Sequence, residues 1–187
     1  MAYFSIFVAT TQNTSSETQG LTRRLVTQVR ERVEKQLPSD VDLTARLCIL
    51  DWIGVTCAGA TEPLARILLE EALSQKSTGK STIVGSSERC SPHLAAMVNA
   101  SSADALDFSD GNLAMHGHTT PAVIATAFAL GQDRGANAGR LLRAIVAGIE
   151  MECLIGLVGS SSLLRKGFHP TGNLATFGAA TTAAYLL

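Results

Sequence analysis

The chain has 187 residues, of which 46% are hydrophobic and only 17% are charged, and its formal net charge is −1 at pH 7. This composition excludes a disordered chain, and the balance of charges excludes the basic surface with which proteins bind nucleic acids or anionic membranes. The segment 111–132 contains no Lys, Arg, Asp or Glu, so we expect it to be buried in a core or against a partner.

The pattern of apolar residues predicts seven helices and little sheet, which makes the fold class all-α. Residues 1–20 are rich in Ser, Thr and Gln and are expected to form a flexible arm before a helical domain over 21–187. Pro38 ends the first helix and Asp40 is the expected N-cap of the second, whose apolar residues lie on most faces and indicate a central position. The predicted helices span 21–37, 41–58, 63–73, 92–106, 121–133, 138–156 and 171–187.

Two segments without helical periodicity, 107–120 and 159–170, interrupt this pattern. The first is a loop of fourteen residues, long enough to suggest a function. Together the two segments contain three of the four histidines.

The four cysteines lie at 48, 57, 90 and 153, with no spacing typical of a disulfide framework or a metal site. Cys48 and Cys57 are nine residues apart in one predicted helix and therefore lie on opposite faces, so we expect buried free thiols in a reducing compartment. The apolar N-terminal run lacks a basic flank and is short for a signal peptide, and no stretch is long enough to cross a membrane. The expected location is the cytoplasm.

The histidines indicate general acid–base chemistry. His116 and His118 share the first loop with Asp107 and Asp110, and His169 lies in the second segment within GFHPTG. Imidazoles titrate near neutral pH and, beside carboxylates, can give or take a proton. The alternatives are that these side chains make only turn hydrogen bonds, or that the His-x-His pair and a carboxylate bind a metal. Because the pair lies on a loop rather than on a strand, we expect no metal.

Several segments resemble the MmgE/PrpD family. They are ARLCILDWIGVTCAGA, AAMVNASSADALDFSD, HTTPAVIATAFALGQDRGANAGRLLRAIVAGIEMECLIG and GFHPTGNLATFGAATTAAYLL, in family order and covering about residues 20–187. The family includes 2-methylcitrate dehydratase, cis-aconitate decarboxylase and iminodisuccinate epimerase.

The resemblance implies a lyase or isomerase that acts on small di- or tricarboxylates, as a homodimer and without a metal or organic cofactor. It implies a helical domain, here without the α/β lid of the family. By position it assigns catalysis to His118, His169 and Asp107, and substrate binding to Asp110, His116 and Thr171. Whether the reaction is dehydration, decarboxylation or epimerisation stays open, as does the choice between His116 and His118 for the loop histidine.

The chain also departs from the family pattern. Asp104 stands where the family usually has a histidine, and Ser109 where it has the first of two adjacent aspartates. No lysine follows Lys166, although the catalytic lysines of the family lie further along, and the last helix stops while it is still apolar. We therefore expect a truncated helical domain with little or no turnover, and activity in a longer form continuing past Leu187. The alternative is a non-catalytic helical module.

Overall fold

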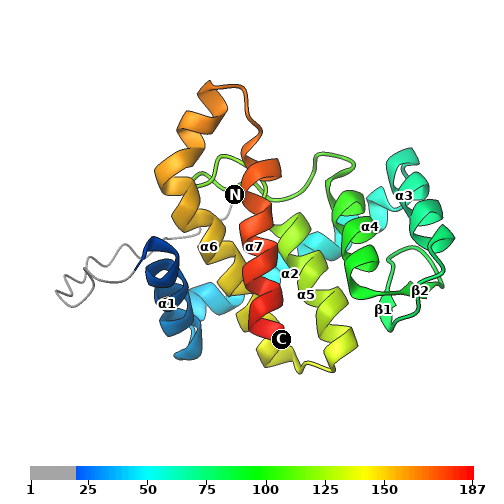
Figure 1. Ribbon diagram of the computed structural model, residues 1–187, viewed down its shortest axis with the longest axis horizontal. Helices are drawn as coiled ribbons and strands as arrows, with labels where there is room; N and C mark the ends of the chain where they lie inside the picture. Colours follow the sequence, from blue (N-terminus) through cyan, green and yellow to red (C-terminus); the bar gives the residue numbers. More distant parts are fainter. Residues whose placement is uncertain (1–19) are drawn as a thin grey trace.

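A computed structural model describes residues 20–187, so the predicted arm, apart from Gly20, lies outside the described residues. Within this range the chain is all-α, with a single small hairpin of two short strands (Figure 1). The elements are α1 (Leu21–Glu34), α2 (Ser39–Gly59), α3 (Pro63–Ser74), β1 (Ser81–Thr82), β2 (Arg89–Cys90), α4 (Pro92–Asp104), α5 (Thr120–Arg134), α6 (Ala138–Arg165) and α7 (Pro170–Leu186).

Most helix boundaries follow local signals in the sequence. A proline stands in the first turn of α3, α4, α5 and α7, where its missing N–H costs no hydrogen bond. Asn137 caps α6, because its Oδ1 accepts from the Arg140 amide at 2.9 Å. The predicted cap at Asp40 is wrong: Pro38 is the residue that precedes α2, and Asp40 lies within its first turn.

The prediction of an irregular segment over 159–170 is also wrong in extent, because α6 continues to Arg165 and only 166–169 are non-helical. Gly156, Gly159 and the following serines have low helix propensity. Tertiary contacts outweigh it: the backbone of the 107–120 loop packs against Gly156, and the Ser160 hydroxyl donates to the Ala114 carbonyl at 3.2 Å.

The main core lies between α2, α5, α6 and α7. Trp52 stacks on Phe128 with ring centroids 5.4 Å apart, and its indole N–H donates to the Pro121 carbonyl. The expectation that segment 111–132 is buried holds for α5, whose Val123 and Ile124 are fully buried, but not for the preceding loop, where Leu113 is 68% exposed. In Figure 1, α1 lies at one side of the molecule against α6, and α3 and the hairpin lie at the other.

The expectation that α2 is central holds for only one of its faces. Trp52 is buried, but Leu43, Leu47 and Leu50 are exposed, the last at 66%. Because apolar residues occur on most faces of this helix, the sequence did not show which face packs against the rest of the chain.

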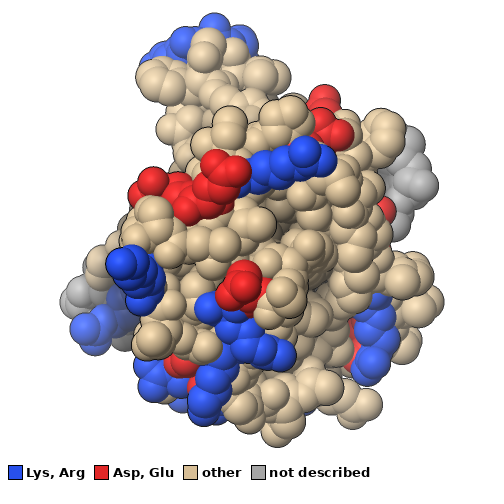
Figure 2. All heavy atoms as spheres, turned by 90° about the vertical axis from the view of Figure 1, so that its right-hand side faces the viewer, with Lys and Arg blue, Asp and Glu red and all other residues tan. Residues whose placement is uncertain are grey.

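Figure 2 shows no large cluster of side chains of a single charge on this face of the molecule. There, over α3 and the hairpin, acidic and basic groups alternate with broad uncharged areas. No single helix within 20–187 is long and apolar enough to cross a membrane; α2 and α3 reach such a length and hydropathy only when taken together, across a bend of 88°.

All four cysteines are free, and the expectation of buried thiols fails for Cys57, which is exposed. Burial raises the pKa of Cys48 to about 11 and that of Cys153 to about 12. Both groups therefore stay protonated at neutral pH and are poor nucleophiles.

Candidate active site

The loop between α4 and α5 has a well-defined backbone. Asn112 and Gly117 exchange backbone hydrogen bonds across a short reversal. Asp107, before this reversal, and His116, within it, have φ angles of 54° and 53°, in the left-handed region that non-glycine residues seldom adopt. Such backbone strain is typical of functional sites.

Asp110 binds the start of α5. Its two carboxylate oxygens accept from the amides and hydroxyls of Thr119 and Thr120, with the Thr119 hydroxyl at 2.6 Å and the Thr120 amide at 2.9 Å. A carboxylate at a helix N-terminus satisfies unpaired amides and interacts favourably with the helix dipole. The Asp110 side chain therefore fixes the loop to the helix.

His118 has a different partner at each ring nitrogen. Nδ1 lies 2.7 Å from the Asp110 carbonyl oxygen and 3.1 Å from the Ser109 hydroxyl. Because a carbonyl only accepts, Nδ1 carries the proton. In the neutral ring Nε2 then keeps a lone pair. This nitrogen lies 3.4 Å from a carboxylate oxygen of the exposed Asp107. This imidazole can take up a proton at Nε2, and the Asp107 carboxylate would stabilise the resulting cation.

The site contains the residue types of a hydrolase catalytic triad in Ser109, His118 and Asp107, but these residues do not form the hydrogen bonds of such a triad. A nucleophilic serine donates its proton to a histidine lone pair. The nitrogen next to Ser109 is instead the protonated one, so it cannot act as a base toward this hydroxyl.

His116 contacts α6 rather than the surroundings of His118. Its Nδ1 lies 2.8 Å from the hydroxyl of the buried Ser160, which itself donates to Ala114. His116 therefore donates to Ser160 and attaches the loop to α6. The two loop histidines contact different elements.

The loop also meets the start of α7. The backbone amide of His118 donates to the Thr171 hydroxyl at 3.0 Å. A Cβ at Gly117 would lie 2.5 Å from the same hydroxyl oxygen, so this approach requires a glycine. His169 is two residues before Thr171, exposed, at the N-cap position of α7. The loop thus contacts the first turn of α7 through His118 and Thr171, close in the chain to His169.

Comparison with known proteins identifies the family. Residues 23–187 match the model of the MmgE/PrpD N-terminal domain. The chain belongs to the MmgE/PrpD family. It is 27% identical over 175 residues to cis-aconitate decarboxylase of Aspergillus terreus, and equally to the protein of that name from strain NIH 2624 of this species. Each match covers 87% of this chain and 36% of the relative, so the chain spans about a third of the length of these relatives.

In this MmgE/PrpD domain, three polar residues near the loop were not predicted from the sequence. Ser109 and Ser160 bind the two loop histidines, and Glu152 is fully buried in α6. A signal existed for Glu152, because it follows Gly148 by four residues and Ile149 by three, on the apolar face of the helix. The serines gave no such signal, since their partners depend on the folded loop.

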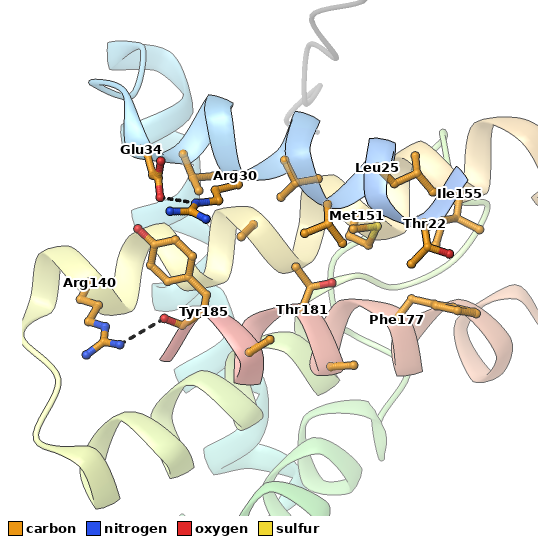
Figure 3. A pocket seen from close by; sticks show the side chains of 16 residues that line it. Thr22, Leu25, Arg30, Glu34, Arg140, Met151, Ile155, Phe177, Thr181 and Tyr185 are labelled. Atoms are coloured by element: carbon orange, nitrogen blue, oxygen red, sulfur yellow. Dashed lines mark hydrogen bonds and ion pairs between the residues drawn. The ribbon is translucent and has the colours of Figure 1, made fainter. Parts of the chain in front are cut away.

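A groove of about 730 Å³ in the MmgE/PrpD domain lies elsewhere, between α1, α6 and α7 (Figure 3). Apolar side chains such as Leu25, Met151 and Phe177 face it, and Arg30 pairs with Glu34 at one end. None of the predicted site residues lines it. The candidate site is therefore the loop and its contacts with α6 and α7, not this groove.

Among residues 20–187, no three His, Cys, Asp or Glu side chains gather closely enough to hold a metal ion. The imidazoles, carboxylates and hydroxyls of the loop can transfer protons and form hydrogen bonds.

Proposed function

We propose that the chain is the N-terminal helical part of a lyase that acts on a small di- or tricarboxylate by proton transfer at the carbon next to a carboxylate. The observation that carries this proposal is the orientation of His118, with a protonated Nδ1 and an Nε2 lone pair beside Asp107. Membership of the MmgE/PrpD family and the similarity to cis-aconitate decarboxylase support it.

The proposed roles follow from the position of each group. In a decarboxylation, the bond to the departing carboxylate breaks, CO₂ leaves, and the electron pair stays on the adjacent carbon. Protonated His118 then delivers its Nε2 proton to that carbon, and Asp107 stabilises the cationic ring before the transfer. In a dehydration, neutral His118 removes a proton from the same type of carbon, and the protonated ring gives this proton to the departing hydroxyl of the neighbouring carbon, so that water leaves. In an epimerisation, His118 removes the proton and a proton returns to the opposite face of the same carbon.

The other predicted residues would hold the substrate or the loop. His169, exposed at the start of α7, would bind a substrate carboxylate as a cation, together with the helix N-terminus. Thr171 and His116 would hold the loop next to the bound substrate, and Asp110 would fix the loop to α5. We further propose a cytoplasmic homodimer that uses neither a metal nor an organic cofactor and binds neither nucleic acid nor membrane.

Among the three reactions, the comparisons favour decarboxylation of cis-aconitate, because both relatives have that name. Dehydration and epimerisation remain alternatives within the same proton chemistry.

A second candidate, a non-catalytic helical module, is favoured by the exposed leucines of α2, which are typical of a surface that binds protein. Such a module would associate through α2 but would not bind a polycarboxylate at His118.

Binding of cis-aconitate, monitored by NMR of the histidine rings, tests the proposal without requiring turnover. We expect cis-aconitate to shift the His118 and His169 signals, and His118→Gln to weaken binding about tenfold through loss of a charge-assisted hydrogen bond. His93→Gln is the matched control, since His93 is exposed on α4 outside the site. Binding that is unchanged in His118→Gln, or no binding at millimolar concentration, would contradict the assignment.

The reaction is identified by its product. In the whole lyase, of which we propose that this chain is the N-terminal part, we expect CO₂ release from cis-aconitate, whereas water loss from 2-methylcitrate or epimerisation of iminodisuccinate would select another family activity.

A further inference from the structure

We propose that Asp104 and Ser109 are positioning residues that fix the tautomer of His118; this inference rests on the proposed role of His118 as the proton-transfer group. Ser109 Oγ lies 3.1 Å from Asp104 Oδ1 and 3.1 Å from His118 Nδ1. Asp104 is the last residue of α4, so the chain of contacts runs from the end of this helix to the imidazole.

The direction of each hydrogen bond follows from the chemistry of the groups. A carboxylate only accepts, so the Ser109 hydroxyl donates its one proton to Asp104. Its oxygen then presents lone pairs to His118, and Nδ1 must be the donor. The Asp110 carbonyl, 2.7 Å from the same nitrogen, imposes the same direction. Two acceptors thus place the proton on Nδ1. The Asp107 carboxylate oxygen, 3.4 Å from Nε2, favours the other tautomer, but it lies beyond the usual hydrogen-bond distance and competes more weakly.

Burial protects this arrangement from water. Ser109 is 9% exposed and Asp104 is half-buried, whereas the Asp107 side chain on the other side of the ring is 89% exposed. The protonated nitrogen therefore faces the protein, and the nitrogen with the lone pair faces the open side, where a substrate would arrive.

Asp104 and Ser109 contact each other directly in the structure. We infer that the pair acts as one unit in this chain, so that the aspartate orients the serine and the serine orients the histidine.

The test measures the tautomer of neutral His118 by long-range ¹H–¹⁵N NMR of the 187-residue protein with labelled histidine. The His118 signal is identified by its loss in His118→Gln. We expect Nδ1–H to predominate in the wild type. Ser109→Ala removes one acceptor, and Asp104→Ala frees the serine proton to donate to Nδ1. Each should shift the tautomer ratio about fivefold toward Nε2–H, as expected for one hydrogen bond.

Two further variants separate positioning from a general loss of packing. Ser109→Thr keeps the hydroxyl and should keep the wild-type ratio. Ser102→Ala removes a buried hydroxyl of the same helix, which donates to the Val98 carbonyl and does not contact His118, and should leave the ratio unchanged.

A predominant Nε2–H form in the wild type would overturn the proposal, and so would an unchanged ratio in either alanine variant. Even if a variant fails to fold, the wild-type spectrum shows whether His118 Nδ1 is the donor in its hydrogen bonds. Because the measurement needs no substrate, failure of the proposed function would leave its result intact.

Discussion

Glu152 is the most unusually placed ionisable residue among those described. Its side chain is fully buried, and neither carboxyl oxygen has a hydrogen-bond partner within residues 20–187. Burial, with a smaller contribution from the Asp110 carboxylate, raises the pKa of Glu152 to about 9. Glu152 is therefore neutral in the folded protein at pH 7 but ionised in the unfolded chain, which makes folding less favourable as the pH rises.

We predict that Glu152→Gln removes this pH dependence. The pKa of Glu152 is higher in the folded state than in the unfolded state. Its contribution to the free energy of unfolding is therefore fully present below about pH 4.5 and is lost progressively as the pH rises to about 9. Relative to the variant, the free energy of unfolding of the wild type should fall by up to about 1.4 kcal/mol per pH unit in this range. Urea unfolding at several pH values measures the difference. Glu70→Gln, an exposed change on α3, is the control, and an equal slope in the two variants would contradict the prediction.

Asp110 provides a second test at the scale of one residue. Asp110→Asn removes the charge and one of two acceptor oxygens from the start of α5, so we expect a loss of roughly 2 kcal/mol in the free energy of unfolding. Asp133→Asn, at the other end of the same helix, should change stability little. If Asp110→Asn left stability unchanged and abolished ligand binding, Asp110 would contact the substrate rather than hold the loop.

Proximity in the chain predicted the candidate site in part. Asp107, Asp110 and His118 lie within twelve residues of one another, so a single loop was bound to bring them near each other. The contacts that determine their chemistry are different. Which nitrogen of His118 is protonated depends on a backbone carbonyl and on Ser109, and neither can be read from spacing.

At the scale of elements, α6 positions the loop through a close contact at Gly156. A Cβ at this position would lie 2.7 Å from Met115 Cα and 2.9 Å from the Ala114 carbonyl oxygen, both part of the loop backbone. A side chain here would displace the loop, and with it His116 and His118.

We therefore predict that Gly156→Ala destabilises the protein by roughly 1–3 kcal/mol, because overpacking exceeds the gain in helix propensity. Gly159→Ala is the matched control: its Cβ would meet nothing within 4 Å, so it should stabilise by up to about 1 kcal/mol. Chemical denaturation gives both values, and NMR should show shifted signals of both loop histidines only in Gly156→Ala. Equal stabilisation by the two changes would refute this role of Gly156.

Helix boundaries set by proline or by an asparagine cap were predictable, because these signals act on their own turn. The end of α6 was not. Its glycines and serines predict a break, and only the packing of a loop from more than forty residues earlier explains why the helix continues.

At the scale of the whole molecule, α2 exposes an apolar stripe. Leu43, Leu47 and Leu50 recur at spacings of four and three residues and lie on one side of the helix. Among the described residues nothing covers them. The sequence predicted the apolar character of α2 but could not indicate which contacts it makes.

We predict that this stripe makes the 187-residue protein self-associate. The double change Leu47→Lys and Leu50→Lys should weaken association at least tenfold, as measured by analytical ultracentrifugation, with little effect on stability because both side chains are exposed. Val158→Lys, a change of similar chemistry at a side chain that is 91% exposed on α6, is the control. Association that persists in the double variant would assign it to another surface.

The last turns of α6 rise above the neighbouring helices in Figure 1. Leu157, Val158 and Leu164 are exposed there, whereas Ser160 contacts the loop at Ala114 and His116. Backbone amides over 157–165 should therefore exchange with deuterium by local opening, much faster than those over 144–153 in the core. Each opening would also release His116 from Ser160, so the loop beside His118 would lose one of its attachments while the rest of the fold stays closed.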